Sequence, residues 1–137
     1  MGDRALTRLL LDTHILLWSL LEPGRLTQRV ASELENPANE LWLSPISTWE
    51  VLVLAEKGQV ILEPDPITWI RNAYVRAPFR EAPLSHKVAI ESRLLDLPHQ
   101  DPADRFLAAT ALVYVLTLVT ADRRLLSSQE ISVLPNL

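Results

Sequence analysis

Short apolar runs alternate with longer segments of mixed polarity along this chain, and most apolar runs end at a polar or turn residue. Short apolar runs with such boundaries are typical of buried strands, whereas longer segments between capping and turn residues favour helices. The pattern predicts strands at residues 8–12, 40–44, 116–120 and near 131–134. It predicts helices at residues 13–22, 27–36, 44–58, 65–77, 85–97, 102–115 and 122–127.

Turn residues mark several of these boundaries. Pro23 and Gly24 stop the first helix, Gly58 closes the third, and Pro98 bounds the helix that begins near Ser85. The alternation of strands and helices predicts an α/β fold with three layers, in which helices cover both faces of a central, mainly parallel sheet of four to five strands. No linker, repeat or low-complexity tract divides the sequence, so residues 1–137 are predicted to form a single domain.

Composition narrows the class of protein. Hydrophobic residues make up 48% of the 137 positions and charged residues 22%, which is typical of a globular chain. The absence of cysteine excludes disulfides and thiolate metal sites. No signal segment opens the chain and no apolar run reaches about 18 residues, so we expect a cytoplasmic protein without membrane association.

The charge balance is acidic, with 17 acidic against 13 basic residues and a net charge of −4. This argues against a protein that binds nucleic acid mainly by neutralising phosphates. It does not exclude a nuclease, because the acidic residues that hold a metal themselves add negative charge.

Four carboxylates lie where one rim of such a sheet would be. Asp12 ends the first strand, and Asp122 lies two residues past the strand that ends at Thr120. Glu50 lies early in the helix after the second strand, and Asp104 lies in the first turn of its helix. Sites in α/β sheets form beyond the carboxyl ends of the strands, so these side chains are expected to face one another.

A group of like charges is unfavourable unless a cation neutralises it. Carboxylate oxygens suit Mg²⁺ or Mn²⁺ rather than zinc, and His14, His86 and His99 do not form a ligand set at suitable spacing. A cation held this way can bind a phosphodiester oxygen and activate water. The pattern therefore predicts a metal-dependent phosphoryl-transfer site.

Each acid also has a structural interpretation. Asp12 and Asp122 could each cap the helix that follows, and Ser47 with Glu50 matches the S-x-x-E capping box. In "HQDPADRFLAATA" (99–111), Asp101 is expected to cap the helix, which leaves Asp104 in its positive first turn as the metal ligand.

Four segments resemble the PIN-domain ribonucleases, specifically the VapC-type toxins of type II toxin–antitoxin modules. They are "LLLDTHILLW" (9–18), "SPISTWEVLVLAEKG" (44–58), "HQDPADRFLAATA" (99–111) and "LTLVTADRRL" (116–125). Their order and spacing fit that family along nearly the whole chain.

The resemblance implies an endoribonuclease that cuts RNA with Mg²⁺ or Mn²⁺. It carries the metal-binding and catalytic roles onto Asp12, Glu50, Asp104 and Asp122, and a supporting role onto Thr120. Asp101 supports Asp104 in this interpretation. The family also implies a homodimer and an antitoxin partner that covers the active-site groove.

Three arginines are candidates for contact with RNA. Arg123 and Arg124 lie beside Asp122, whereas Arg105 is expected to form a surface ion pair, with a phosphate contact as the alternative. His14 and His99 fall within the similar motifs, and we expect them to orient neighbours through hydrogen bonds.

One departure from the family pattern concerns substrate contact: Leu54 stands where relatives often carry Lys. Three alternatives remain open, namely a PIN-like interaction module without catalysis, a nuclease that acts on DNA, and a phospho-acceptor receiver domain. The receiver domain would need adjacent acids after the first strand and a Lys after a late strand, and this chain lacks both.

Overall fold

A parallel five-stranded sheet forms the centre of the computed structural model, which describes residues 7–98 and 100–137. The strands are β1 (Arg8–Leu11), β2 (Glu40–Leu43), β3 (Phe79–Glu81), β4 (Thr117–Thr120) and β5 (Ser132–Pro135). Their order across the sheet is β3-β2-β1-β4-β5, and every neighbouring pair is parallel. The predicted fold class is therefore confirmed.

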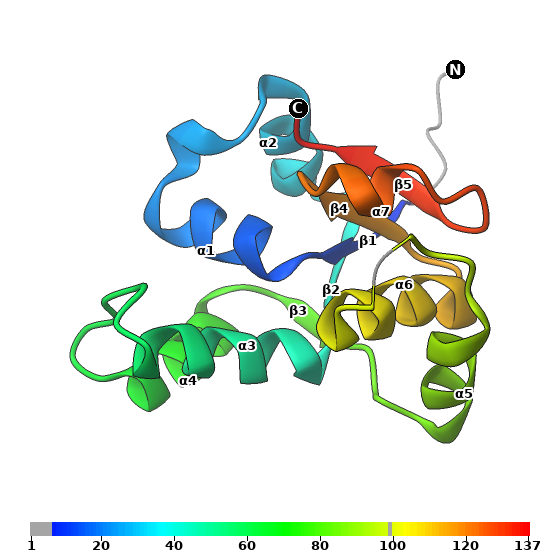
Figure 1. Cartoon of the computed structure of the whole chain (residues 1–137). Helices are drawn as coiled ribbons and strands as arrows, with labels where there is room; N and C mark the ends of the chain where they lie inside the picture. The colour runs from blue at the N-terminus through cyan, green and yellow to red at the C-terminus, as the bar shows by residue number, and fades with distance from the viewer. Residues whose placement is uncertain (1–6, 99) are drawn as a thin grey trace, which may run out of the picture.

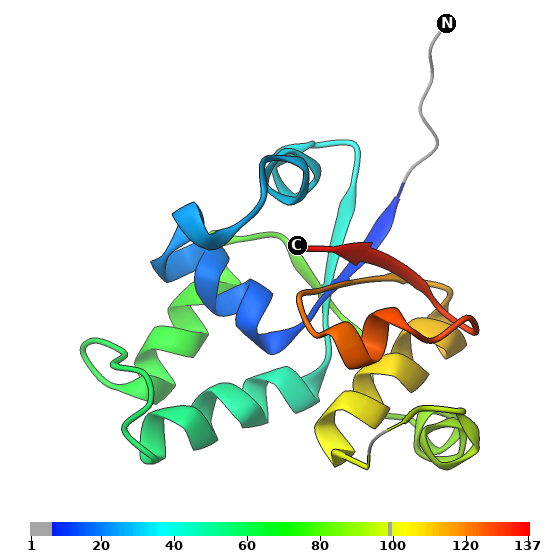
Figure 2. The same ribbon diagram turned by 45° about the horizontal axis from the view of Figure 1, so that its top comes forward.

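Helices cover both faces of this sheet (Figures 1 and 2). They are α1 (Thr13–Leu21), α2 (Gln28–Glu35), α3 (Pro45–Glu56), α4 (Pro66–Arg76), α5 (His86–Leu94), α6 (Pro102–Tyr114) and α7 (Arg123–Leu126), with the 3₁₀ turn η1 (Pro23–Arg25) after α1. Among residues 7–98 and 100–137, no helix is both long and apolar enough to cross a bilayer.

The two faces of the sheet form two hydrophobic cores, and β1 contributes to both. Leu9 and Leu11 pack in the core with α1 to α4, whereas Leu10 packs in the core with α5 to α7. Successive side chains of a strand point to opposite faces, so a strand buried on both sides needs a continuous apolar run. The run "RLLL" meets that need, which is why the sequence pattern located β1 correctly.

The strand β3 was missed by the sequence pattern. It has three residues, "FRE", of which Arg80 and Glu81 are exposed, and it lies between Pro78 and Pro83. An edge strand with one buried face and prolines nearby gives no apolar run to detect.

The helix starts follow the expected chemistry. Thr27, Ser44, Asp65, Ser85 and Asp101 each accept a hydrogen bond from a backbone N–H in the first turn of their helix. Such caps contribute about 0.5–2 kcal/mol each. The alternative interpretation of Ser47 and Glu50 as a capping box fails, because Ser44 is the cap and Ser47 lies inside α3.

One side-chain amide near the end of the chain connects distant segments. Asn136 is buried, and its Nδ2 donates to the Arg25 carbonyl at 3.1 Å while its Oδ1 accepts from the Thr27 backbone N–H at 2.7 Å. Its backbone N–H donates to the Thr120 carbonyl at 2.8 Å. The turn that carries Arg25 is thereby fastened to the end of β4.

Candidate active site

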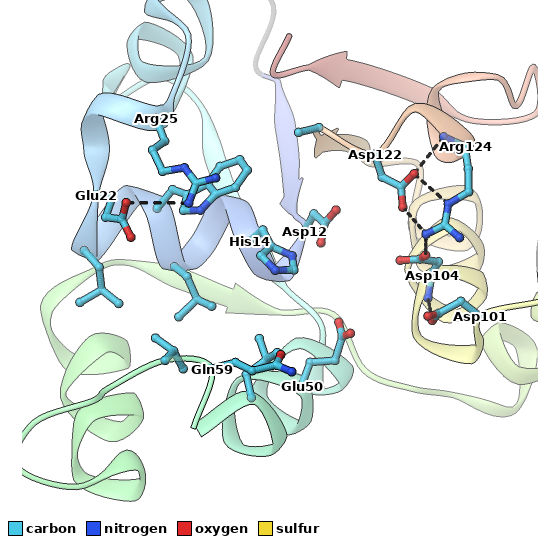
Figure 3. Close-up of a pocket in the computed structure, with 16 residues that line it drawn as sticks. Asp12, His14, Glu22, Arg25, Glu50, Gln59, Asp101, Asp104, Asp122 and Arg124 are labelled. Atoms are coloured by element: carbon cyan, nitrogen blue, oxygen red, sulfur yellow. Dashed lines mark hydrogen bonds and ion pairs between the residues drawn. The ribbon is translucent and has the colours of Figure 1, made fainter. Parts of the chain in front are cut away.

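A cavity of about 610 Å³ opens at the carboxyl edge of the sheet (Figure 3). The register pairs Leu11 with Val119, so the residues that follow β1 and β4 come out at the same edge. Six carboxylates line the cavity: Asp12, Glu22, Glu50, Asp101, Asp104 and Asp122. The structure thus brings together all four predicted ligands and Asp101.

Asp12 is the most buried of these acids, with 8% of its surface exposed. It occupies the N-cap position of α1, yet its carboxylate makes no capping hydrogen bond, so the interpretation as a helix cap fails. Instead, Oδ2 accepts a hydrogen bond from the Thr120 hydroxyl at 2.6 Å. Burial raises the pKa of Asp12, and the Thr120 bond together with nearby His14 only partly offsets this effect.

Thr120 connects two of the acids. While its hydroxyl donates to Asp12, its Oγ1 accepts from the Asp122 backbone N–H at 3.0 Å. Thr120 is fully buried, so this geometry is fixed by the packing of β4. The supporting position predicted for Thr120 agrees with these contacts.

Glu50 projects from α3 toward Asp12 (Figure 3). Its Oε1 accepts a hydrogen bond from the Thr13 hydroxyl at 2.6 Å, and the Thr13 hydroxyl also lies 3.1 Å from the Ser47 hydroxyl. Partial burial raises the pKa of Glu50; the Thr13 bond opposes this rise, and the charges of Asp12 and Asp101 add to it. A hydroxyl from the residue after Asp12 therefore aims the carboxylate of α3.

Asp101 and Asp104 lie at the start of α6. Asp101 Oδ1 accepts from the Asp104 backbone N–H at 3.2 Å, with Pro102 as the first helical residue. Asp104 is the acidic residue of the first turn, where the helix dipole favours its ionised form. The predicted division between a capping Asp101 and a cavity-facing Asp104 matches this geometry.

Asp122 both caps a helix and lines the cavity. Its Oδ1 accepts from the Arg124 backbone N–H at 2.9 Å, which caps α7, and the carboxylate faces the cavity. The Arg124 guanidinium group contacts Asp122, with 3.0 Å between Nη2 and Oδ2. The same Nη2 lies 3.5 Å from Asp104 Oδ2.

The prediction for Arg105 is wrong. Its side chain is 4% exposed, and it donates from Nε to the Ser92 carbonyl at 2.7 Å and from Nη2 to the Leu95 carbonyl at 2.6 Å. The guanidinium group donates to carbonyls at the end of α5 from inside the protein, so Arg105 does not lie at the surface, where the expected ion pair or phosphate contact would form. Sequence position beside an acidic motif did not distinguish these cases.

The other basic candidates differ in position. Arg124 lines the cavity, whereas Arg123 is exposed and is not among the described residues that line it. His14 lines the cavity and lies 5.9 Å from Trp18 between ring centroids. His99 lies outside the described residues.

The cavity also has an aromatic and basic end that the sequence did not reveal. The Arg25 guanidinium carbon lies 4.3 Å from the centre of the Trp18 ring, and Arg25 also forms an ion pair with Glu22 at 3.8 Å, away from Asp104 and Asp122 (Figure 3). Arg25 follows Pro23 and Gly24 in a turn, where no local pattern indicates a site.

The donor chemistry of the carboxylate end fits a hard divalent cation, because every acidic ligand candidate offers oxygen. The Asp12 carboxylate is buried among them, and burial raises its pKa, an effect that a bound cation would oppose. Within the described ranges, however, no three Asp, Glu or His side chains converge closely enough to hold one ion. Binding would therefore require the side chains to turn toward one another.

Comparisons with known proteins support one family. The family model described as PIN domain matches residues 9–129. The chain is 34% identical over 123 residues to Ribonuclease VapC22 of Mycobacterium tuberculosis (strain ATCC 25618 / H37Rv), and the match covers 89% of this chain and 92% of that protein.

Solved structures share the fold at lower sequence identity. VapBC2 from Rickettsia felis, bound to a DNA fragment from their promoter, matches with a TM-score of 0.70 and 14% identity over 94% of this chain and 98% of that chain. DNA-bound VapBC from Salmonella typhimurium matches with a TM-score of 0.68 and 17% identity over 96% of this chain and 100% of that chain. The arrangement of strands and helices is therefore shared with these proteins.

Proposed function

The chain belongs to the PIN-domain family, and from this premise we propose that it is a metal-dependent endoribonuclease and the toxin of a toxin–antitoxin pair. The observation that carries the proposal is that Asp12, Glu50, Asp104 and Asp122 line one cavity at the edge of the sheet. The similarity to a protein named as a ribonuclease supports RNA as the substrate.

In this proposal the four acids hold Mg²⁺ or Mn²⁺, which supplies charge neutralisation and water activation at the scissile phosphate. The remaining contribution of the protein is to hold these acids in position. Thr120 fixes Asp12 relative to Asp122, and Thr13 fixes Glu50. Burial of Asp12 keeps bulk water away from one ligand and strengthens its attraction to a cation.

The cleavage test uses purified protein, total RNA and Mn²⁺, with the cut sites mapped. We expect cleavage by the wild type, and a loss of at least about 100-fold in Asp12→Asn and Asp104→Asn because each removes a charged ligand. Asp96→Asn is the matched control, since Asp96 is exposed and lies outside the cavity. Equal activity in the wild type and both site variants would reject the assigned acids.

The same experiment separates the alternatives. A parallel reaction with DNA of the same sequence tests the choice of sugar, and cleavage of DNA alone would reject the ribonuclease. A wild type that binds Mn²⁺ and cuts neither nucleic acid would favour the PIN-like interaction module.

An antitoxin partner is part of the proposal, because the structural neighbours are described as VapBC complexes. Expression of the wild type in a host without an antitoxin should arrest growth, whereas Asp104→Asn should be tolerated at the same protein level. Harmless wild-type expression would contradict the toxin role alone. The homodimer and the cytoplasmic location stay predictions, and light scattering tests the dimer.

A further inference from the structure

Arg124 lies between two of the proposed metal ligands. Its Nη2 is 3.0 Å from Asp122 Oδ2 and 3.5 Å from Asp104 Oδ2, and its Nε donates to Asp122 Oδ1 at 3.2 Å. Figure 3 shows the guanidinium group beside both carboxylates, at the ends of α6 and α7. The positive charge of Arg124 therefore offsets part of the negative charge on this side of the cavity.

The guanidinium group and a divalent cation would compete for this position. A carboxylate oxygen has lone pairs to spare, so hydrogen bonding alone does not prevent ligation. The positive charge of Arg124 does oppose ligation, because a cation bound to Asp104 and Asp122 would lie within a few ångströms of the guanidinium group and be repelled by it.

Arg124 is held in a way that permits movement. Its side chain is 55% exposed, and exposed ion pairs contribute little to stability. Its side-chain contacts with the Asp104 and Asp122 carboxylates are made by the guanidinium group at the end of a flexible stem, while the backbone N–H of Arg124 donates separately to Asp122 Oδ1. The side chain can therefore swing into solvent without disturbing the backbone of α7.

We propose that Arg124 is an internal counter-ion, which holds the Asp104 and Asp122 carboxylates in the metal-free protein and moves aside when Mg²⁺ or Mn²⁺ binds. This inference rests on the proposed metal site. Arg124 is then a positioning residue that lowers the affinity for metal, rather than a group that acts on RNA. It also accounts for carboxylates that line one cavity without converging on one point.

The test measures the dissociation constant of Mn²⁺ on the folded full chain, from the electron paramagnetic resonance signal of free Mn²⁺. Arg124→Gln should bind Mn²⁺ about three- to tenfold more tightly than the wild type, because the competing charge is gone. Arg123→Gln is the matched control: it makes the same change in net charge at an exposed neighbour, and its affinity should stay within about twofold.

A second readout reports Arg124 directly. In a nitrogen-edited NMR spectrum, the Arg124 Nε–H resonance should shift when Mg²⁺ is added, as its bond to Asp122 is lost. The Arg123 resonance should remain in place. A purely structural role for Arg124 predicts neither the shift nor tighter binding.

Unchanged or weaker Mn²⁺ binding by Arg124→Gln, with normal binding by the wild type, would overturn the inference and leave the metal site intact. If the wild type and Asp104→Asn both fail to bind Mn²⁺, the proposed metal site itself falls. If Arg124→Gln does not fold, Arg124→Met replaces it. Methionine also removes the competing charge, so the variant should bind Mn²⁺ more tightly than the wild type, and equal affinity would overturn the inference.

Discussion

Burial of the Asp12 carboxylate lowers the stability of the metal-free protein. The carboxylate is buried at the end of β1, and the neighbouring hydroxyl of Thr120 offsets only part of its lost hydration. A protein that needed only a helix cap here could use an exposed Ser or Asn. The arrangement makes sense when a cation completes it.

In protein freed of divalent cations, Asp12→Asn should be more stable than the wild type at pH 7. Burial raises the pKa of Asp12 in the folded state above its unfolded value, so the folded protein holds this proton more tightly. The stability that the protonated Asp12 carboxyl contributes is therefore lost as the pH rises from the unfolded-state pKa through the folded-state pKa. Asparagine does not ionise, so Asp12→Asn loses no stability in this way. Urea unfolding in EDTA should show an advantage of Asp12→Asn that grows as the pH rises above the unfolded-state pKa of Asp12.

Mn²⁺ should reverse this order at pH 7, because only the wild type keeps the full set of ligands. An Asp12→Asn protein that is less stable at every pH without metal would contradict this account of Asp12.

Thr120→Val should lower RNA cleavage without abolishing it. Valine has the same shape but removes the donor to Asp12 and the acceptor for the Asp122 N–H, so RNA cleavage should fall by about 10- to 100-fold. Stability should fall by about 1–3 kcal/mol. The control is Thr117→Val on the same strand, whose hydroxyl lies near Ser132 outside the cavity. Equal losses of activity in the two variants would argue against a special role for Thr120.

Single residues were predictable where strand ends are visible in the sequence. Asp12 and Asp122 follow apolar runs, and parallel strands place such residues at one edge. The contact between Thr13 and Glu50 was not predictable, because it joins positions on separate elements. Arg105 was misjudged for the same reason: only the packing of α5 against α6 reveals that it is buried.

At the scale of elements, α6 connects the site to the second core. Its N-terminal turn presents Asp104 to the cavity, and Leu107 and Ala108 pack beneath the sheet. Arg105 fastens the same turn to the end of α5 through two backbone carbonyls. The position of Asp104 therefore depends on contacts that face away from the cavity.

Arg105→Met should destabilise the protein by about 2–4 kcal/mol, because two buried carbonyls lose a charged donor. Unfolding in urea measures this loss, with Arg29→Met on the exposed face of α2 as the control. RNA cleavage should fall at least as far as the folded fraction does, because Arg105 also anchors the turn that carries Asp104. A large loss of cleavage at unchanged stability would instead restore Arg105 as a substrate contact.

Strands that are buried on both faces were easier to predict from the sequence than strands with an exposed face. The strands β1 and β4 are covered on both sides and appear as apolar runs. The edge strand β3 has exposed polar residues and was missed. The predicted helix at 85–97 ends earlier, at Leu94, because Leu95 has extended backbone geometry while its side chain still packs in the core.

At the scale of the whole molecule, the two cores share the central strand. Leu10 on one face and Leu9 and Leu11 on the other are almost fully buried. Loosening either core therefore disturbs the strand that carries Asp12. We expect the two halves of the sheet to unfold together rather than separately.

Leu10→Ala should lower the free energy of unfolding by about 2–5 kcal/mol, as a large side chain is removed from a closely packed core. Leu16→Ala, in the opposite core, should have a similar effect. Circular dichroism and tryptophan fluorescence should report the same midpoint for each variant. Two separate transitions would contradict the shared strand.

Asn136 has a practical consequence for fusion proteins. Its amide fastens the turn of Arg25 and Thr27, and its backbone joins the end of β4 beside the cavity. Leu137 lies between these hydrogen bonds and a protein that is joined directly after it. A tag or fluorescent reporter joined there without a flexible spacer would disturb the end of the cavity that contains Arg25. Metal and RNA binding measured on such a fusion would then differ from binding to the protein without a tag.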